Sequence, residues 1–217
     1  MEQETALSSL IISSTSAIGV TLEPDQVEKF LIYLKQLRLW NRTMNLTGIS
    51  DEREIIIKHF IDSLAGLRAE WFGQRSHVLD VGTGAGFPGI PLRIARPDLL
   101  LTLIEPVKKK ASFLHFLVGL LRLEQVKIFE GTLEQFIEND RSEESFDYVT
   151  TRALKHDLIM RKCSRLLRKK NGKALFYLSK SLGSRPLSSE FSLVNEYTFE
   201  LPQGFGRRVI SVLAVSK

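Results

Sequence analysis

From His77 onward, short apolar runs alternate with stretches of helical pattern. The runs have the length and composition of buried strands and cover residues 77–81, 99–105, 126–130, 145–151 and 173–180. The stretches between them predict helices over 89–96, 108–123, 132–138 and 156–172. Alternating strands and helices are typical of a parallel sheet with helices on both faces. We therefore predict an α/β fold for this part of the chain.

The tail breaks this alternation. Residues 192–201 and 208–217 are both strand-like, and only residues 202–207 separate them. A connection this short cannot be a crossover helix, so the two strands must pair antiparallel. The expected fold is a Rossmann-like, mostly parallel sheet of seven strands that ends in a C-terminal antiparallel hairpin.

The first third of the chain has a different, helical pattern. Apolar residues recur at helical spacing over 24–40, and Pro24 suits a first helical position. After a polar and glycine-containing break, residues 51–67 begin with the cap-like pair Asp51 and Glu54 and predict a second amphipathic helix. We expect one domain over residues 1–217, in which a helical segment, residues 1–75, packs on a core formed by residues 76–217.

Composition limits the classes of protein to which the chain belongs. Cys163 is the only cysteine, so no internal disulfide is possible, and no apolar run approaches the roughly 20 residues of a membrane span. The start of the sequence is not expected to act as a secretory segment. A net charge of +5 suits a polyanionic partner. We expect a cytoplasmic protein that does not contact a membrane.

Four glycines follow the first predicted strand within eight positions, and two ligands fit their spacing. Gly84 to Gly89 reads GAGFPG, and Glu105 lies 21 positions after Gly84. This is the spacing of a dinucleotide-binding loop, in which the acid accepts hydrogen bonds from a ribose. A nicotinamide-dependent oxidoreductase is therefore one reading of the chain.

The second register is Asp80-x-Gly82-x-Gly84-x-Gly86, which is typical of class I methyltransferases that use S-adenosylmethionine (AdoMet). Its glycines let the backbone lie against the cofactor, and the acid after the second strand, Glu105, accepts from the ribose diol. The long helical segment before the loop and the C-terminal hairpin both favour this register over the dinucleotide one.

Several segments resemble one bacterial family in the right order. Residues 80–99, DVGTGAGFPGIPLRIARPDL, closely resemble the RsmG family, also called GidB. The pair NLTGI and HFIDSL, the lysine-rich KKKASFL and the strand FDYVTTRA are similar to further segments of that family. The resemblance extends from about Trp40 to the C-terminus.

The resemblance implies a reaction and a cofactor site. The family transfers a methyl group from AdoMet to N7 of one guanosine, position 527, in 16S ribosomal RNA. Residues that match the family's AdoMet site are Gly82, Phe87, Glu105, Leu133, Glu134 and Arg152. One departure is visible, because Lys180-Ser181 stands where Lys-Gly is expected. The implied partner is 16S rRNA or the small ribosomal subunit, and we expect a monomer.

Contacts to the RNA are expected from two groups of residues. Asn45, His59 and Asp62 lie in the segments that match the family's N-terminal pattern, although His59 and Asp62 also suit a local helix pair and Asn45 a turn. Lys109, Lys180 and Arg207 are expected near the carboxyl edge of the sheet, where they would contact phosphates.

The chemistry needs little from the protein. Guanine N7 carries an in-plane lone pair and no proton, so the expected reaction requires no general base and we assign no catalytic acid or base. The histidines show no ligand spacing, so we predict no metal. A non-catalytic ribosomal RNA-binding protein with the same fold remains a further alternative.

Overall fold

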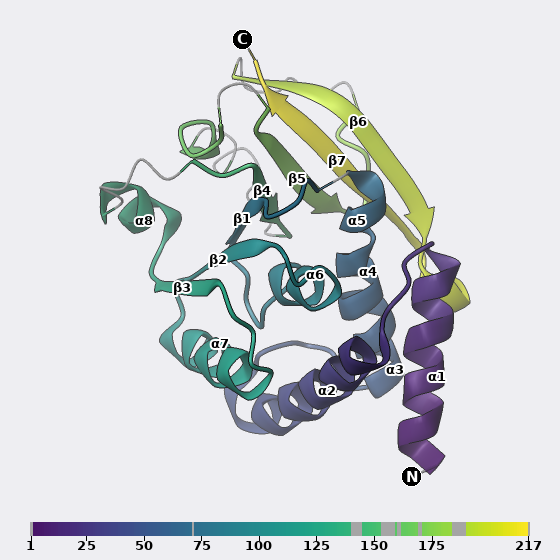
Figure 1. Cartoon of the computed structure of the whole chain (residues 1–217). Coiled ribbons are helices and arrows are strands. Elements are labelled where there is room, and N and C mark those ends of the chain that lie inside the picture. Colours follow the sequence, from purple (N-terminus) through teal and green to yellow (C-terminus); the bar gives the residue numbers. More distant parts are fainter. Residues whose placement is uncertain are drawn as a thin grey trace.

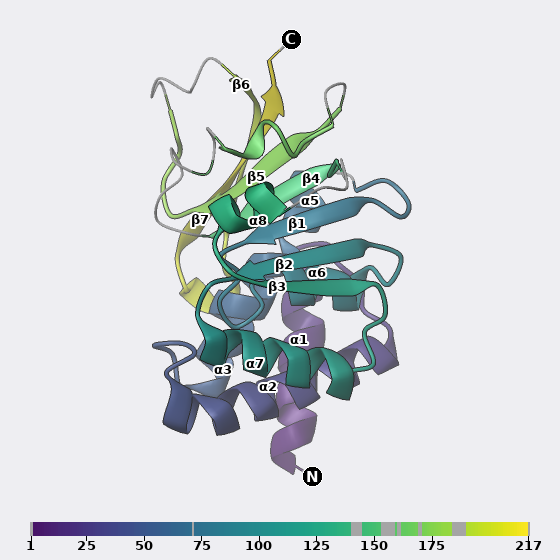
Figure 2. The same cartoon turned by 90° about the vertical axis from the view of Figure 1, so that its left-hand side faces the viewer.

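The computed structural model describes residues 2–70, 72–139, 145–152, 159, 162–168, 171–183 and 190–216. Seven strands form one sheet in the order β3-β2-β1-β4-β5-β7-β6 (Figures 1 and 2). The strands are β1 (His77–Val81), β2 (Leu100–Glu105), β3 (Val126–Glu130), β4 (Tyr148–Thr151), β5 (Lys173–Leu178), β6 (Phe191–Glu200) and β7 (Arg207–Val215). β1 to β5 pair parallel, while β7 pairs antiparallel with both β5 and β6. The predicted sheet, including its terminal hairpin, is confirmed.

Helices precede β1 and also lie in the connections between strands. They are α1 (Glu2–Ala17), α2 (Pro24–Met44), α3 (Glu52–Ile55), the π-helix η1 (Ile56–Ile61), α4 (Asp62–Leu64), α5 (Gly66–Ala69), α6 (Gly89–Ala95), α7 (Lys108–Leu120), α8 (Leu133–Asn139) and the 3-10 turn η2 (Pro202–Gly204). Of the helix predicted over 156–172, residues 156–158, 160, 161, 169 and 170 lie outside the described residues. Ile159, Lys162 and Cys163 are helical, whereas residues 164–166 form a turn and Leu167 forms an isolated β-bridge with Phe146. Of that segment, Ile159, Cys163, Leu166 and Leu167 are buried.

Apolar residues cover the two faces of the sheet unequally. Val78 and Leu79 are neighbours on β1, yet they belong to different apolar clusters because successive strand residues point to opposite faces. The larger cluster joins one face of the sheet to α1, α2, η1, α6 and α7. The smaller one lies on the other face and includes residues of α8 (Figure 2) together with Ile159, Cys163, Leu166 and Leu167.

The second predicted helix differs from its expectation. Asp51 caps it as predicted, accepting the backbone N–H of Glu54 at 2.9 Å. The helix then widens into η1, whose hydrogen bonds span five residues instead of four. It is not amphipathic, because every residue from Ile55 to Gly66 except Lys58 is buried. The cause is tertiary: α1, α6 and the sheet together enclose this segment.

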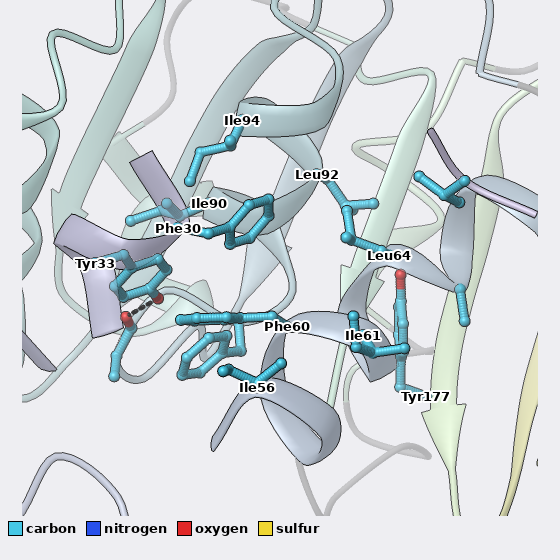
Figure 3. Packing of buried hydrophobic residues seen from close by; sticks show 14 of the residues in the cluster. Phe30, Tyr33, Ile56, Phe60, Ile61, Leu64, Ile90, Leu92, Ile94 and Tyr177 are labelled. Carbon is cyan, nitrogen blue, oxygen red and sulfur yellow. Dashed lines mark hydrogen bonds between the residues drawn. The ribbon is translucent and has the colours of Figure 1, made fainter. Parts of the chain in front are cut away.

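Aromatic rings join α2 to η1 beneath the glycine loop. Phe30 and Tyr33 of α2 pack on Phe60 of η1 with ring centroids 5.1 and 5.0 Å apart (Figure 3). All three side chains are fully buried. The N-terminal helical segment therefore shares its core with the sheet and contacts the loop directly.

Candidate cofactor site at the carboxyl edge of the sheet

β1 to β5 all end at one edge of the sheet, which we call the carboxyl edge. The glycine loop, residues 82–88, leaves β1 at this edge and is held mainly by its backbone. The N–H groups of Gly82 and Thr83 donate to Ile104 O at 3.0 and 3.2 Å, and those of Gly86 and Phe87 donate to Thr83 O. The loop is therefore tied to the end of β2, where Glu105 lies.

Two glycines of the loop serve different purposes. Both have positive φ, +63° at Gly84 and +108° at Gly86, which L side chains rarely adopt. A Cβ at Gly86 would lie 2.7 Å from the hydroxyl of Tyr33 and from Cδ1 of Ile90. A Cβ at Gly84 would meet nothing within 4 Å. Gly86 thus permits packing within the protein, while Gly84 leaves one side of the loop open to a ligand.

Two buried carboxylates brace the loop from either side. Oδ2 of Asp80 accepts the Thr83 hydroxyl at 2.6 Å and the Gly89 N–H at 2.8 Å. Burial raises the pKa of Asp80 to about 6. Glu105 accepts the N–H groups of Gly84 at 2.8 Å and Val107 at 2.9 Å, one on each oxygen. Both carboxylates therefore fix backbone positions at the edge where the cofactor is expected.

The ring of Phe87 lies inside the protein. It is 5% exposed and stacks between Tyr33, at 5.4 Å and 11°, and His59, at 4.6 Å and 21°. The hydroxyl of Tyr33 donates to Ala85 O at 2.6 Å and so holds the loop from α2 (Figure 3). Tyr33 was not predicted to hold the loop. Its position on the apolar stripe of α2 is a usable signal, because a buried tyrosine hydroxyl needs a hydrogen-bond partner.

Arg152, which follows β4, connects the loop to the N-terminal helices. Its guanidinium donates to Nδ1 of His59 at 3.0 Å and to Oδ2 of Asp62 at 3.3 Å, and lies 5.4 Å from the centre of the Phe87 ring. Nε of Arg208, on β7, lies 3.9 Å from Oδ1 of Asp62. The structure thus gathers residues that are far apart in the sequence around one buried carboxylate.

The hydrogen bonds fix the tautomer of His59. An arginine can only donate, so Nδ1 accepts from Arg152 and Nε2 carries the proton. Nε2 donates to the hydroxyl of Thr47 at 2.8 Å. Burial, followed by the positive charge of Arg152, lowers the pKa of His59 to about 3. Burial raises the pKa of Asp62, although Arg152 and Arg208 oppose the rise. His59 is therefore a neutral, packed side chain.

Leu133 and Glu134 begin α8 at the same edge, directly after β3. Leu133 is buried, whereas Glu134 forms an ion pair with Lys162. The hydrogen bond from Lys162 lowers the pKa of Glu134 to about 2. The carboxylate is thus engaged within the protein, and the start of α8 can offer a ligand its backbone.

Some of the residues predicted to contact RNA are exposed in the structure and others are buried. Asn45, Lys109, Lys180 and Arg207 are exposed. Lys180 follows β5 and Arg207 begins β7, so both lie at the carboxyl edge as expected. His59 and Asp62 are buried and bonded to Arg152. An RNA contact by either side chain would require breaking that arrangement.

These features fit an AdoMet-type cofactor. Gly84 leaves the loop open, and Glu105 lies at the end of β2 and is bonded to the Gly84 N–H. Within the described residues, no group of three or more histidine, cysteine or acidic side chains is placed to hold a metal ion. None of the described helices is long and apolar enough to cross a membrane.

Comparison with known proteins agrees with this fold. A putative O-methyltransferase from Klebsiella pneumoniae superposes with a TM-score of 0.63 at 14% identity, covering 99% of this chain and 100% of that one. At this identity the likeness shows the fold alone.

Similarity in sequence goes further. A ribosomal RNA small subunit methyltransferase G from Caldanaerobacter subterraneus is 43% identical over 145 residues, which are 67% of this chain and 61% of that protein. The protein of the same name from Leuconostoc mesenteroides is 33% identical over 207 residues, 91% of this chain and 87% of its own. A family model described as GidB, rRNA small subunit methyltransferase G, matches residues 26–194. The chain therefore belongs to the GidB family.

Proposed function

We propose that this protein transfers a methyl group from AdoMet to N7 of guanosine 527 in 16S ribosomal RNA. One observation carries the proposal: a chain of the GidB family has a glycine loop that is open at Gly84, with Glu105 directly beside it. The proposed RNA substrate would place the protein in the cytoplasm, where ribosomes are assembled.

The cofactor would be held mainly by backbone and by one carboxylate. Gly82 and Gly84 allow close approach to the loop. Each oxygen of Glu105 accepts one N–H bond, and a carboxylate has about four acceptor positions, so Glu105 can still accept the two hydroxyls of a ribose. The start of α8 at Leu133 and Glu134 supplies backbone groups at the same edge. Phe87 would support the loop from behind.

The chemistry asks for orientation more than for proton transfer. Bound AdoMet supplies an electrophilic methyl group on its sulfonium. The N7 lone pair attacks without losing a proton, so the protein must only align the two reactants. His59 suits this mechanism because it is neutral, buried and bonded at both ring nitrogens, and it does not act as a general base.

His59 and Asp62 are better described as positioning residues for Arg152 than as RNA contacts. They hold the guanidinium beside Phe87, at the end of β4. Direct contacts to the RNA would come from the exposed residues Asn45, Lys109, Lys180 and Arg207. Lysines and arginines on phosphates make binding weaken as salt rises, and a few contacts give a shallow slope.

The test uses small ribosomal subunits that lack the modification. Wild-type protein with labelled AdoMet should label one guanosine, which is mapped in the RNA and yields the alkali-labile product of N7 methylation. Glu105→Ala should weaken AdoMet binding about ten-fold or more, the scale of lost hydrogen bonds to a charged group. Glu130→Ala is the matched control, because Glu130 ends the neighbouring strand but is exposed and pairs with His115.

Two results would contradict the proposal. Binding of a nicotinamide dinucleotide in place of AdoMet would make the chain an oxidoreductase. Binding of the subunit without any methyl transfer from AdoMet would make it a non-catalytic RNA-binding protein.

A further inference from the structure

Exposed apolar side chains gather along one face of α7 and its cap. Phe116 is 40% exposed, Leu120 44% and Val107 40%. Phe116 lies against Trp40 of α2, with ring centroids 5.1 Å apart and planes tilted by 32°. α2 and α7 run side by side in Figures 1 and 2. We call this surface, formed by Trp40, Phe116 and Leu120, the α2–α7 seam.

Lysines at the start of α7 extend the α2–α7 seam. Lys109, Ser112, Phe116 and Leu120 follow one another in steps of three, four and four, so they share one face of α7. All four are exposed. Lys109 precedes Phe116 by seven positions, which is about 10 Å along a helix. No ion pair involves Lys108, Lys109 or Lys110 among the described residues.

The start of α7 leads to the cofactor site. Lys108 comes three residues after Glu105, and the N–H of Val107 donates to that carboxylate. A ligand that extends along α7 would therefore reach from the seam to the carboxyl edge of the sheet. The seam is outside the cofactor site, and nothing in the proposed methyl transfer requires it.

Exposed aromatic rings on the same helix face as a lysine suit a single-stranded nucleic acid. Bases stack on exposed aromatic side chains, and the backbone phosphates are neutralised by cations nearby. A protein partner that covered Phe116 and the start of α7 would instead have to pair or desolvate three lysines. Charge complementarity thus favours RNA over a second copy of this chain.

We propose that the α2–α7 seam binds an unpaired nucleotide of the RNA substrate, with its base on Phe116 and Trp40 and its phosphate backbone along Lys108, Lys109 and Lys110. This inference rests on the proposed function, because it assumes that RNA is the substrate. It adds a contact that extends away from the cofactor along α7.

The first measurement is the affinity of the full chain for small ribosomal subunits that lack the modification. Phe116→Ala should weaken binding about five-fold or more, the scale of one lost base stack. Phe116→Tyr keeps an aromatic face and should restore binding. Leu193→Ala is the matched control: Leu193 is 38% exposed on β6, and its loss should leave affinity unchanged. AdoMet affinity, measured by calorimetry, should be equal in all four proteins.

The second measurement reports on the stack itself. The chain has two tryptophans, so Trp71→Phe leaves Trp40 as the only tryptophan, whose emission is excited selectively above the tyrosine absorption band. A short single-stranded oligoribonucleotide should quench its emission, and Phe116→Ala should reduce that quenching. An oligodeoxynucleotide duplex should quench it less, because its bases are paired.

The outcomes separate this inference from the proposed function. If wild type methylates the subunits and Phe116→Ala does so with the same KM, the seam is not an RNA contact while the proposed function stands. If Phe116→Ala converts a dimer into a monomer in sedimentation, the seam binds a second copy and the inference is overturned. If wild type neither binds nor methylates the subunits, both fail.

Discussion

The glycine loop and helix η1 lie against each other at the carboxyl edge, yet they are held in opposite ways. The loop is fixed by backbone hydrogen bonds, by Asp80 and Glu105, and by the conformations that Gly84 and Gly86 allow. η1 is fixed by side chains that reach distant segments: His59 bonds Thr47 and Arg152, and the ammonium of Lys58 lies 5.2 Å from the Phe205 ring.

This difference predicts how substitutions in the two regions should affect cofactor binding and stability. A change in the loop acts on a local backbone arrangement and on the ligand that approaches it. A change around η1 leaves buried polar groups in several elements without partners, and such groups cost free energy wherever they lie. The first kind of change should separate cofactor binding from stability, and the second should couple them.

The largest effect is expected from Arg152→Met. It leaves the buried Asp62 with Arg208 alone, at 3.9 Å, and Nδ1 of His59 without a donor. Removing one partner of a buried pair costs about 3–5 kcal/mol, so the free energy of unfolding should fall by about that amount in urea titrations. Adding Asp62→Asn should recover part of the loss, because the buried charge is then gone. Full stability in the single variant would contradict the role of Arg152 in holding η1.

Within the loop, one alanine substitution should mainly lower stability and another should mainly weaken AdoMet binding. Gly86→Ala should lower the free energy of unfolding by about 3 kcal/mol, because the new Cβ meets Tyr33 and Ile90 and the backbone has positive φ. Gly84→Ala should cost about 1 kcal/mol, since only the backbone conformation opposes it. Calorimetry should nevertheless find AdoMet binding at least ten-fold weaker in Gly84→Ala. Equal stability in the two variants would remove the distinction between the two glycines.

The two regions should also respond oppositely to pH. The pKa of His59 is about 3 in the folded protein and 6.5 ordinarily. Between these pH values His59 is protonated in the unfolded chain and neutral in the folded one. The contribution of His59 to the free energy of unfolding therefore rises with pH. The pKa of Asp80 is about 6 in the folded protein and 3.8 ordinarily. Between these pH values Asp80 is protonated in the folded chain and ionised in the unfolded one. The contribution of Asp80 to the free energy of unfolding therefore falls as pH rises. Each slope is about 1.4 kcal/mol per pH unit, and the two oppose each other between about pH 4 and 6.

Unfolding titrations from pH 4 to 6 measure these slopes by difference. Stability of wild type minus that of His59→Gln should rise with pH, and wild type minus Asp80→Asn should fall. Two differences of the same sign would show that one of the two groups does not have the protonation state assigned to it.

The smallest effect concerns Thr47. A double-mutant cycle of Thr47→Val and His59→Gln should give a coupling energy of about 1 kcal/mol, the net value of one hydrogen bond. Thr43→Val is the control, because its hydroxyl is exposed and donates to the Trp40 carbonyl in its own turn. A cycle with Thr43 should give no coupling to His59; equal coupling in both cycles would mean that the Thr47 bond has no net value.

Much of the loop could be predicted from the sequence, because its causes are local. The glycine spacing, the strand before it and Glu105 after the next strand are all visible within residues 77–105. The cap at Asp51 and the terminal hairpin were predictable for the same reason: a cap depends on three neighbouring residues, and a six-residue connection forces antiparallel pairing.

The side-chain contacts around η1 depend on the tertiary structure alone. The sequence of residues 51–67 predicted an amphipathic helix on which His59 and Asp62 either contact the RNA or form a local helix pair, whereas in the structure both are buried and bonded to Arg152. Arg152 is some 90 positions away from them and Tyr33 some 50 from the loop it holds, so no local pattern records these contacts. The sequence by itself determined the order of strands along the chain, the loop and the likeness to the GidB family. Folding decided which polar groups share a buried space, because that depends on packing between segments, and the periodicity of one segment carries no information about its neighbours in space.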